Sequence, residues 1–198
     1  MDSTAWDERY STSELIWTGR ANQFVERHLA DLEPGTAVDL GAGEGRNAVW
    51  LAQRGWTVTA VDFSPVGLEK ASKLAEDHGV EITVECADAT TWEPDGPVDL
   101  VLLSYLQLPA AQQHAVLERA ATWLRPGGTL FVVAHDRSNI DVGYGGPPSA
   151  EVCYSVDDTV AALAGLDVTI AEVAERAVDT AEGTRTAFDT LVIAQRPT

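Results

Sequence analysis

Two apolar runs stand out in the pattern of hydrophobic and polar positions along the chain. Residues 98–103 and 129–134 are apolar almost throughout, which is typical of strands covered on both faces, as in a parallel sheet. Shorter runs at 36–40 and 56–61 predict two further strands. Apolar residues at helical spacing predict helices over 22–32, 44–52, 65–78, 109–124 and 155–164. Strands that alternate with helices indicate an α/β fold with a mainly parallel sheet.

The remaining strand candidates have a different pattern of apolar and polar residues. Residues 80–86 alternate strictly between apolar and polar side chains, which predicts an edge strand with one wet face and with Cys86 pointing into the core. Residues 166–173 and 187–194 predict two more strands, which are joined through Gly183 and are therefore antiparallel. Seven strands are thus expected in all.

Composition and charge narrow the possible functions. The chain has 198 residues, 45% of them hydrophobic, which favours one sizeable core and a single domain over 1–198. Its 31 acidic and 13 basic residues give a net charge of −18, which repels polyanions and predicts no nucleic-acid partner. Residues 1–9 are polar and acidic, and no apolar stretch approaches the length of a membrane span. These features predict a cytoplasmic protein, monomeric or homodimeric, without a membrane contact.

Cysteine and histidine spacing gives no sign of a disulfide framework or a metal site. Cys86 and Cys153 are the two cysteines of the chain, and we expect both to be reduced. No Cys-x-x-Cys or His-x-x-x-His spacing occurs, so no metal ligands are expected.

A glycine-rich stretch at 37–47, AVDLGAGEGRN, joins the first strand to the following helix. Glycine at Gly41, Gly43 and Gly45 lets the backbone turn sharply and approach a ligand closely. The sixth position of a strict Gly-x-Gly-x-x-Gly pattern is Arg46, so the dinucleotide fingerprint is not met. The strand, turn and helix together still predict a nucleoside cofactor, with a purely structural helix–sheet turn as the alternative.

An acidic residue follows the second strand. Asp62 lies 21 positions after Gly41, where a carboxylate can accept hydrogen bonds from two ribose hydroxyls. Nicotinamide-dinucleotide enzymes and S-adenosylmethionine (SAM) enzymes share this spacing. The spacing therefore indicates that the ligand contains adenosine, but it does not distinguish between the reactions of these two classes of enzyme.

Three segments resemble a protein family. The run DLGAGEGRN at 39–47, with VDFS at 61–64 and LRPGG at 124–128, is similar to class I SAM-dependent methyltransferases. The opening WDERY at 6–10 and the Gly-Arg-Asn ending resemble the small-molecule subgroup of tellurite-resistance and thiol methyltransferases. The likeness spans about residues 5–135.

The resemblance implies a Rossmann-like seven-stranded sheet, mostly parallel, with an antiparallel last strand and helices on both faces. It also implies SAM as the cofactor, with Asp62 on the ribose and Asp88 on the adenine amino group. Arg46 either pairs with the cofactor carboxylate or an anionic acceptor, or lies on the helix surface. The full set of implied cofactor-binding residues is Asp39, Gly41, Ala42, Gly43, Arg46, Asn47, Asp62, Phe63, Asp88, Ala89 and Ser104.

Two segments are expected to enclose the methyl acceptor. Residues 1–33 predict a helical N-terminal cover, in which Trp6, Tyr10 and Trp17 either exclude water from the site or cover sheet edges. Residues 135–154 are rich in glycine and proline, which predicts a loop acting as a lid.

Candidate acceptor-side residues follow the fourth and fifth strands, because ligands bind at the carboxyl ends of parallel strands. They are Ser104, Tyr105, His135, Asp136 and Arg137. His135 and Tyr105 are the catalytic candidates. His135 is either a general base or a hydrogen-bonded structural group.

Methyl transfer is an in-line displacement that needs alignment and exclusion of water, and it needs no base when the acceptor is an anion or a thiol. The first hypothesis is therefore transfer of a methyl group from SAM to a small thiol or another soft nucleophile. The alternative is an oxygen or nitrogen acceptor with His135 as the base. A nicotinamide-dependent oxidoreductase and a non-catalytic SAM-binding protein are less favoured.

Overall fold

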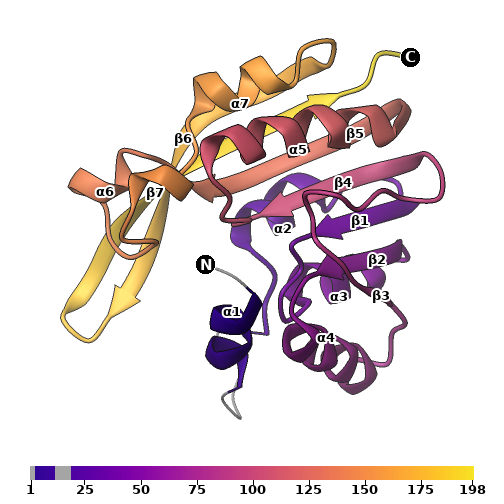
Figure 1. Ribbon diagram of the computed structural model, residues 1–198, viewed down its shortest axis with the longest axis horizontal. Helices are drawn as coiled ribbons and strands as arrows, with labels where there is room; N and C mark the ends of the chain where they lie inside the picture. The colour runs from indigo at the N-terminus through magenta and orange to yellow at the C-terminus, as the bar shows by residue number, and fades with distance from the viewer. Residues whose placement is uncertain (1–2, 12–18) are drawn as a thin grey trace. The chain divides into compact units, whose positions relative to one another are not determined.

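The computed structural model describes residues 3–11 and 19–198, with side chains from Trp6 onward. These residues group into two compact units, Met1–Ser104 and Tyr105–Thr198 (Figure 1). The single domain predicted over 1–198 therefore stays a prediction.

The first unit is built on four parallel strands. They are β1 (Thr36–Leu40), β2 (Thr57–Asp62), β3 (Thr83–Cys86) and β4 (Val98–Ser104). Their order is β3-β2-β1-β4, so that Leu40 pairs with Val61 on one side and with Leu103 on the other. β1 lies between β2 and β4, and both β1 and β4 are almost entirely buried. Their carboxyl ends and that of β2 therefore lie at one edge of the sheet.

The first unit also contains four helices. They are α1 (Ser3–Tyr10), α2 (Gln23–Leu29), α3 (Arg46–Ala52) and α4 (Pro65–Asp77). Side-chain caps define where two of them begin, because the Asn22 side chain accepts from the N–H of Phe24 and the Ser64 side chain from that of Gly67. α1 and α2 confirm helices within residues 1–33, whereas Trp17 lies outside the described residues.

The third strand departs from its prediction. β3 is an edge strand, as expected, but all four of its residues are exposed, and the predicted inward position of Cys86 is wrong. Val80 and Ile82, just before the strand, carry the packing against Val49 and Leu74 instead. An edge strand has a neighbour on one side only, so alternation alone does not bury its end.

The second unit is a three-stranded sheet in the order β5-β7-β6, in which β7 is antiparallel to both neighbours. Its strands are β5 (Leu124–His135), β6 (Asp167–Thr180) and β7 (Gly183–Gln195). Its helices are α5 (Ala110–Trp123), α6 (Asn139–Val142), the 3-10 turn η1 (Ala150–Val152) and α7 (Val156–Ala162). Pairing with β5 stops at His135 and Asp189, beyond which β6 and β7 continue as a two-stranded hairpin (Figure 1).

Residues 125–128 belong to β5, which starts directly after α5. The N–H of Gly127 donates to the carbonyl of Arg196, and the N–H of Arg196 donates to the carbonyl of Gly128. Gly127 still has a positive φ of 80°, as in a turn, but its N–H is hydrogen-bonded to the chain just after β7.

The expected fold class is confirmed: residues 3–11 and 19–198 contain seven strands, with helices around them, and among these strands β7 alone runs against the others in its unit. Among the described residues, no helix is long and apolar enough to cross a membrane.

Candidate active site

The glycine-rich turn follows β1 directly. Gly41, Gly43 and Gly45 have φ values of 81°, 54° and 78°, in the left-handed region that favours glycine. The N–H groups of Gly41 and Ala42 both donate to the carbonyl of Val61, which ties the turn to β2. A Cβ on Gly45 would lie 2.5 Å from the Cβ of Ala71, so this third glycine allows α4 to approach the turn. The turn is therefore fixed by the sheet below it and by helix packing.

Asp62 reaches the turn from the end of β2. Its carboxylate accepts one hydrogen bond from the N–H of Gly43 and one from the N–H of Ser64, each at 2.9 Å. Each carboxylate oxygen keeps a second lone-pair position, so the group can accept further hydrogen bonds from two hydroxyls. Burial raises the pKa of Asp62, and the N–H groups of Ser64 and Gly43 counteract this rise.

Asp39 is the penultimate residue of β1, and its side chain is fully buried. Neither of its carboxylate oxygens accepts a hydrogen bond of normal geometry, although the backbone N–H of Ala48 faces the group and helps to lower its pKa. Burial raises the pKa of Asp39 from 3.8 to about 7, although the charge of Arg46 acts in the opposite direction. A buried carboxylate with so few hydrogen-bond donors is costly unless a partner binds it, and SAM carries such a partner in its ammonium group. Asp39, the turn and Asp62 therefore fit the predicted cofactor.

The other predicted cofactor residues are spread over the same unit. Asn47 accepts a hydrogen bond from the N–H of Asn22 at 2.9 Å, so its side chain joins α3 to the start of α2. Asp88 is exposed and accepts from the N–H and hydroxyl of Thr90. Phe63 and Ser104 are half-buried and Ala89 is buried. The hydroxyl oxygen of Ser104 has no hydrogen-bond partner among the described residues.

Helix α1 lies against the turn. The hydroxyl of Ser64 donates to the Asp7 carboxylate, and Tyr10 is buried with its hydroxyl oxygen beside Gly43. The ring of Trp6 stacks on that of Tyr10, with centroids 5.4 Å apart. Sequence reasoning named the two aromatic residues and missed Asp7, although it lies between them in the WDERY segment.

The second unit holds a separate polar cluster formed by Tyr105, His135, Arg176 and Asp189. The Asp189 carboxylate is fully buried; its Oδ2 accepts from the Tyr105 hydroxyl at 2.9 Å and from Nε of Arg176 at 2.7 Å. Nδ1 of His135 lies 3.3 Å from Oδ1 of Asp189, at an angle that leaves both atoms without a hydrogen bond.

The electrostatics of this cluster favour an ionised Asp189. Burial opposes ionisation, but the polar contacts with His135 and Arg176 outweigh burial and hold the pKa of Asp189 below its usual value. Tyr105 has a φ of 57°, which is rare for a bulky residue and points to functional strain. The rings of Tyr105 and His135 lie 4.7 Å apart between centroids.

Sequence reasoning found Tyr105 and His135 and missed their two charged partners. The signal was present for Asp189, which is the only charged residue in the apolar run 187–194. Such a residue in a buried strand needs a buried partner. Nothing in the sequence pairs it with Arg176, because strand register alone brings them together.

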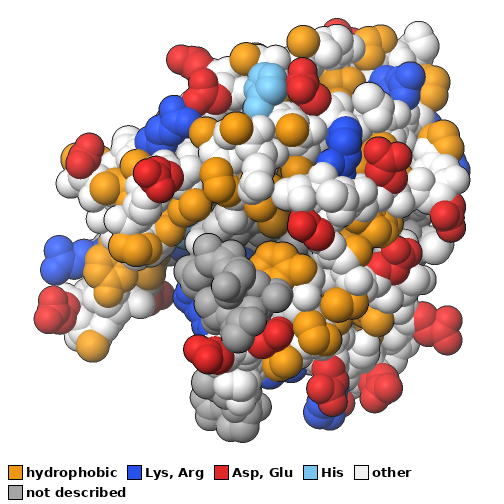
Figure 2. All heavy atoms as spheres, in the orientation of Figure 1, with side chains coloured by type: hydrophobic (Ala, Val, Ile, Leu, Met, Phe, Trp, Pro, Cys, Tyr) orange, Lys and Arg blue, Asp and Glu red, His pale blue; other side chains and the backbone are white. Residues whose placement is uncertain are grey.

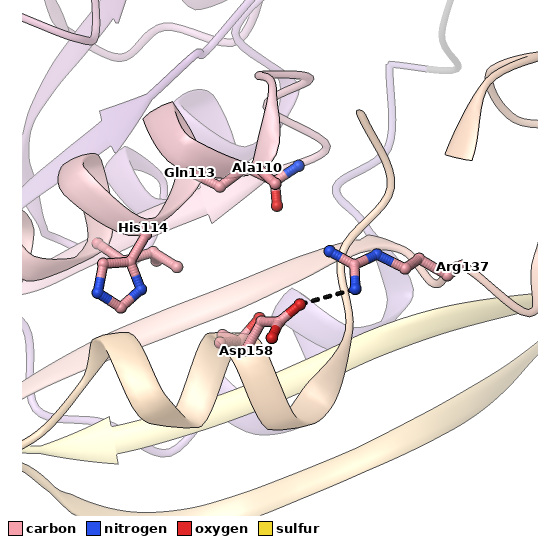
Figure 3. A pocket seen from close by; sticks show the side chains of 7 residues that line it. Ala110, Gln113, His114, Arg137 and Asp158 are labelled. Carbon is pink, nitrogen blue, oxygen red and sulfur yellow. Dashed lines mark ion pairs between the residues drawn. The ribbon is translucent and has the colours of Figure 1, made fainter. Parts of the chain in front are cut away.

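Asp136 and Arg137, the other acceptor-side candidates, have structural contacts. Asp136 is buried and accepts hydrogen bonds from Ser138 and from the hydroxyl of Thr190. Arg137 forms an ion pair with Asp158 of α7 at 2.7 Å (Figure 3). This pair lines a pocket of about 80 Å³ beside α5. Arg137 thus joins the chain after β5 to α7.

Three or more potential metal ligands do not gather anywhere in the described part of the chain.

Comparisons with known proteins fit this geometry. Residues 37–128 match the family model described as a methyltransferase domain. The whole chain is similar in fold to the N-methyltransferase NodS from Bradyrhizobium japonicum WM9, solved with S-adenosyl-L-homocysteine. The TM-score is 0.75 and the identity 14%, covering 99% of this chain and 98% of that one. Residues 37–128 thus form a methyltransferase domain of the class I SAM-dependent type. The predicted family and its cofactor, SAM, are confirmed.

Curated relatives differ in the acceptor that their names give. This methyltransferase chain is 31% identical over 128 residues to the tRNA 5-carboxymethoxyuridine methyltransferase of Escherichia coli K12, covering 62% of this chain and 47% of that protein. It is 40% identical over 122 residues to the trans-aconitate 2-methyltransferase of Streptomyces coelicolor, covering 56% of this chain and 39% of that protein. The chain thus spans less than half the length of these relatives.

Proposed function

We propose that this chain transfers a methyl group from SAM to a small-molecule acceptor, whose oxygen or nitrogen gives up its proton to His135. The observation that carries the proposal is the contact between His135 and the buried, ionised Asp189. A carboxylate beside Nδ1 favours the tautomer that carries its proton there and leaves Nε2 as the acceptor. This arrangement is the usual support for a histidine base.

SAM supplies the methyl group on a positively charged sulfur. Asp62 would hold SAM through hydrogen bonds from the ribose hydroxyls, and Asp39 would balance its ammonium group. Gly43 allows the backbone to come close to the cofactor. His135 takes the proton from the acceptor, and Asp189 orients the imidazole. The chain thus contributes alignment and one proton transfer, which is sufficient for an in-line displacement.

Charge supports a small acceptor over RNA. The net charge is −18, and acidic side chains are spread over the face drawn in Figure 2, where basic ones are fewer. An RNA substrate would meet repulsion on such a surface. The exposed apolar side chains of Ile140, Val142 and Tyr144, in the loop after His135, suit an acceptor that is partly apolar. The relative named for trans-aconitate is in keeping with a small acceptor.

A thiol or another soft nucleophile is the second candidate. Oδ2 of Asp189 already accepts from Arg176 and Tyr105, so Asp189 does not depend on the imidazole for its hydrogen bonds. A thiol is partly ionised near neutral pH and needs no base. Turnover measured on a panel of thiols, chalcogen oxyanions, phenols and amines tests both candidates. Activity confined to thiols or chalcogen oxyanions would favour the second.

The cofactor assignment is tested through Asp62. We expect Asp62→Ala to weaken SAM binding at least about tenfold, because charge-assisted hydrogen bonds contribute about 1.5–3 kcal/mol. Calorimetry with SAM measures this loss, and Asp77→Ala, which removes an exposed carboxylate at the end of α4, is the control. Unchanged affinity in a folded Asp62→Ala protein would remove Asp62 from the cofactor site.

A further inference from the structure

Asn139 is a buried amide at the start of α6, with 2% of its surface exposed, and both ends of the amide are used. Its Oδ1 accepts from the N–H of Phe188 at 2.8 Å, and its Nδ2 donates to the carbonyl of Gly145 at 2.9 Å. Phe188 directly precedes Asp189 in β7. One side chain therefore joins the strand segment that carries Asp189 to the loop that follows His135.

The loop segment held by Asn139 touches the imidazole of His135. Gly146 has a φ of 88°, and a Cβ added there would lie 3.1 Å from both Cγ and Nδ1 of His135 and 3.2 Å from Nδ2 of Asn139. A methyl group at this position would therefore press on the imidazole ring. Removing the hydrogen bond to Gly145 frees this backbone to move away from the imidazole.

The described contacts that hold the glycine segment include the Asn139 side chain, the backbone bond from the N–H of Gly143 to the carbonyl of Asn139, and the buried Pro147. α6 has four residues, too few for a stable helix without tertiary contacts. The following residues include Gly143, Gly145, Gly146, Pro147 and Pro148, and glycine gives the backbone its largest freedom. The Asn139 amide is therefore one of the contacts that keep residues 145–146 beside His135.

We propose that Asn139 is a positioning residue for His135. It holds residues 145–146 against the imidazole, so that Nδ1 stays within reach of Asp189 Oδ1. This inference rests on the proposed role of His135 in methyl transfer. It also changes the expected role of residues 135–154, because their first half then acts as a fixed support for the base and does not open as a lid.

Three variants test the proposal. Asn139→Asp keeps an oxygen that accepts from the N–H of Phe188. It replaces the NH2 group that donates to the carbonyl of Gly145 with a second carboxylate oxygen, which cannot donate. Asn139→Ala removes both contacts, and Gly146→Ala pushes on the imidazole directly. Ser149→Ala is the matched control, because it removes a hydrogen bond to Glu151 in the same loop. We expect kcat to fall about tenfold in Asn139→Asp and further in Asn139→Ala, with KM for SAM unchanged, since misplacing a catalytic group affects the chemical step.

A spectroscopic readout separates this proposal from the proposed function. We expect the ¹⁵N signals of the His135 imidazole to shift or broaden in Asn139→Asp and in Gly146→Ala, and to remain as in the wild type in Ser149→Ala. Imidazole signals and kcat that match the wild type in a folded Asn139→Asp protein overturn the positioning role. Altered imidazole signals in a protein that methylates no acceptor support the positioning role and count against the proposed function. If Asn139→Ala does not fold, the Asn139→Asp and Gly146→Ala proteins still test the positioning role of Asn139.

Discussion

Replacing His135 with alanine is expected to lower kcat about a hundredfold on oxygen and nitrogen acceptors, which is the usual contribution of a general base. The physical reason is the arrangement around the imidazole. Asp189 is buried and ionised beside Nδ1, while Tyr105 and Arg176 hold the carboxylate in place. SAM affinity should change little, because His135 contributes nothing to the predicted cofactor site.

Turnover over the acceptor panel, with calorimetric SAM binding alongside, measures the effect of His135→Ala. The control is His114→Ala, which removes an exposed histidine that lies 3.5 Å from Glu118 on the surface of α5. Wild-type turnover on phenols or amines by a folded His135→Ala protein would contradict the base role. If the His135→Ala protein turns over thiols alone and at the wild-type rate, the result would favour a thiol or another soft nucleophile as the acceptor.

Replacing Asp39 with asparagine is expected to stabilise the folded protein and to weaken SAM binding. Burial raises the pKa of Asp39 to about 7, above the 3.8 expected in the unfolded chain. Between these values the native state holds a proton that the unfolded state has lost, so stability falls as pH rises through this window. Above pH 7 the full shift costs roughly 4 kcal/mol, since one pKa unit corresponds to about 1.4 kcal/mol. Asparagine cannot ionise and escapes this cost.

Urea unfolding without cofactor at pH 5 and pH 8 measures the stability change for Asp39→Asn. We expect its advantage over the wild type to grow by roughly 3 kcal/mol between these two conditions. SAM affinity should fall about tenfold or more, because the carboxylate charge that balances the ammonium is lost. Asp77→Asn, at an exposed site, should change neither quantity. An advantage that does not depend on pH would show that Asp39 does not titrate as inferred.

The cofactor half of the chain could be predicted from the sequence because its signals are local. The glycines at 41, 43 and 45 and the acidic residue at 62 follow strands of clear apolar pattern, and the structure has β1 and β2 there. A turn and a strand end are specified by residues that are neighbours in the chain. The same locality made the capping residue Ser155 of α7 predictable.

The features that could not be predicted from the sequence depend on contacts between residues that are far apart in the chain. Asp189 meets Tyr105, 84 positions away, and no local periodicity records that pairing. The exposure of Cys86 depends on the missing neighbour of an edge strand, and the inclusion of residues 125–128 in β5 depends on pairing with Arg196. Each feature is decided by which segments lie side by side in the fold.

Transfer of labelled methyl groups from SAM tests the central claim most directly. The wild-type protein is incubated with methyl-labelled SAM, a mixture of small thiols, phenols, amines and carboxylates, and total tRNA. The label is then followed in the small-molecule and RNA fractions. We predict that the label appears in a small molecule, with release of S-adenosylhomocysteine, and that the RNA fraction stays unlabelled. Label in the RNA fraction alone would contradict the account.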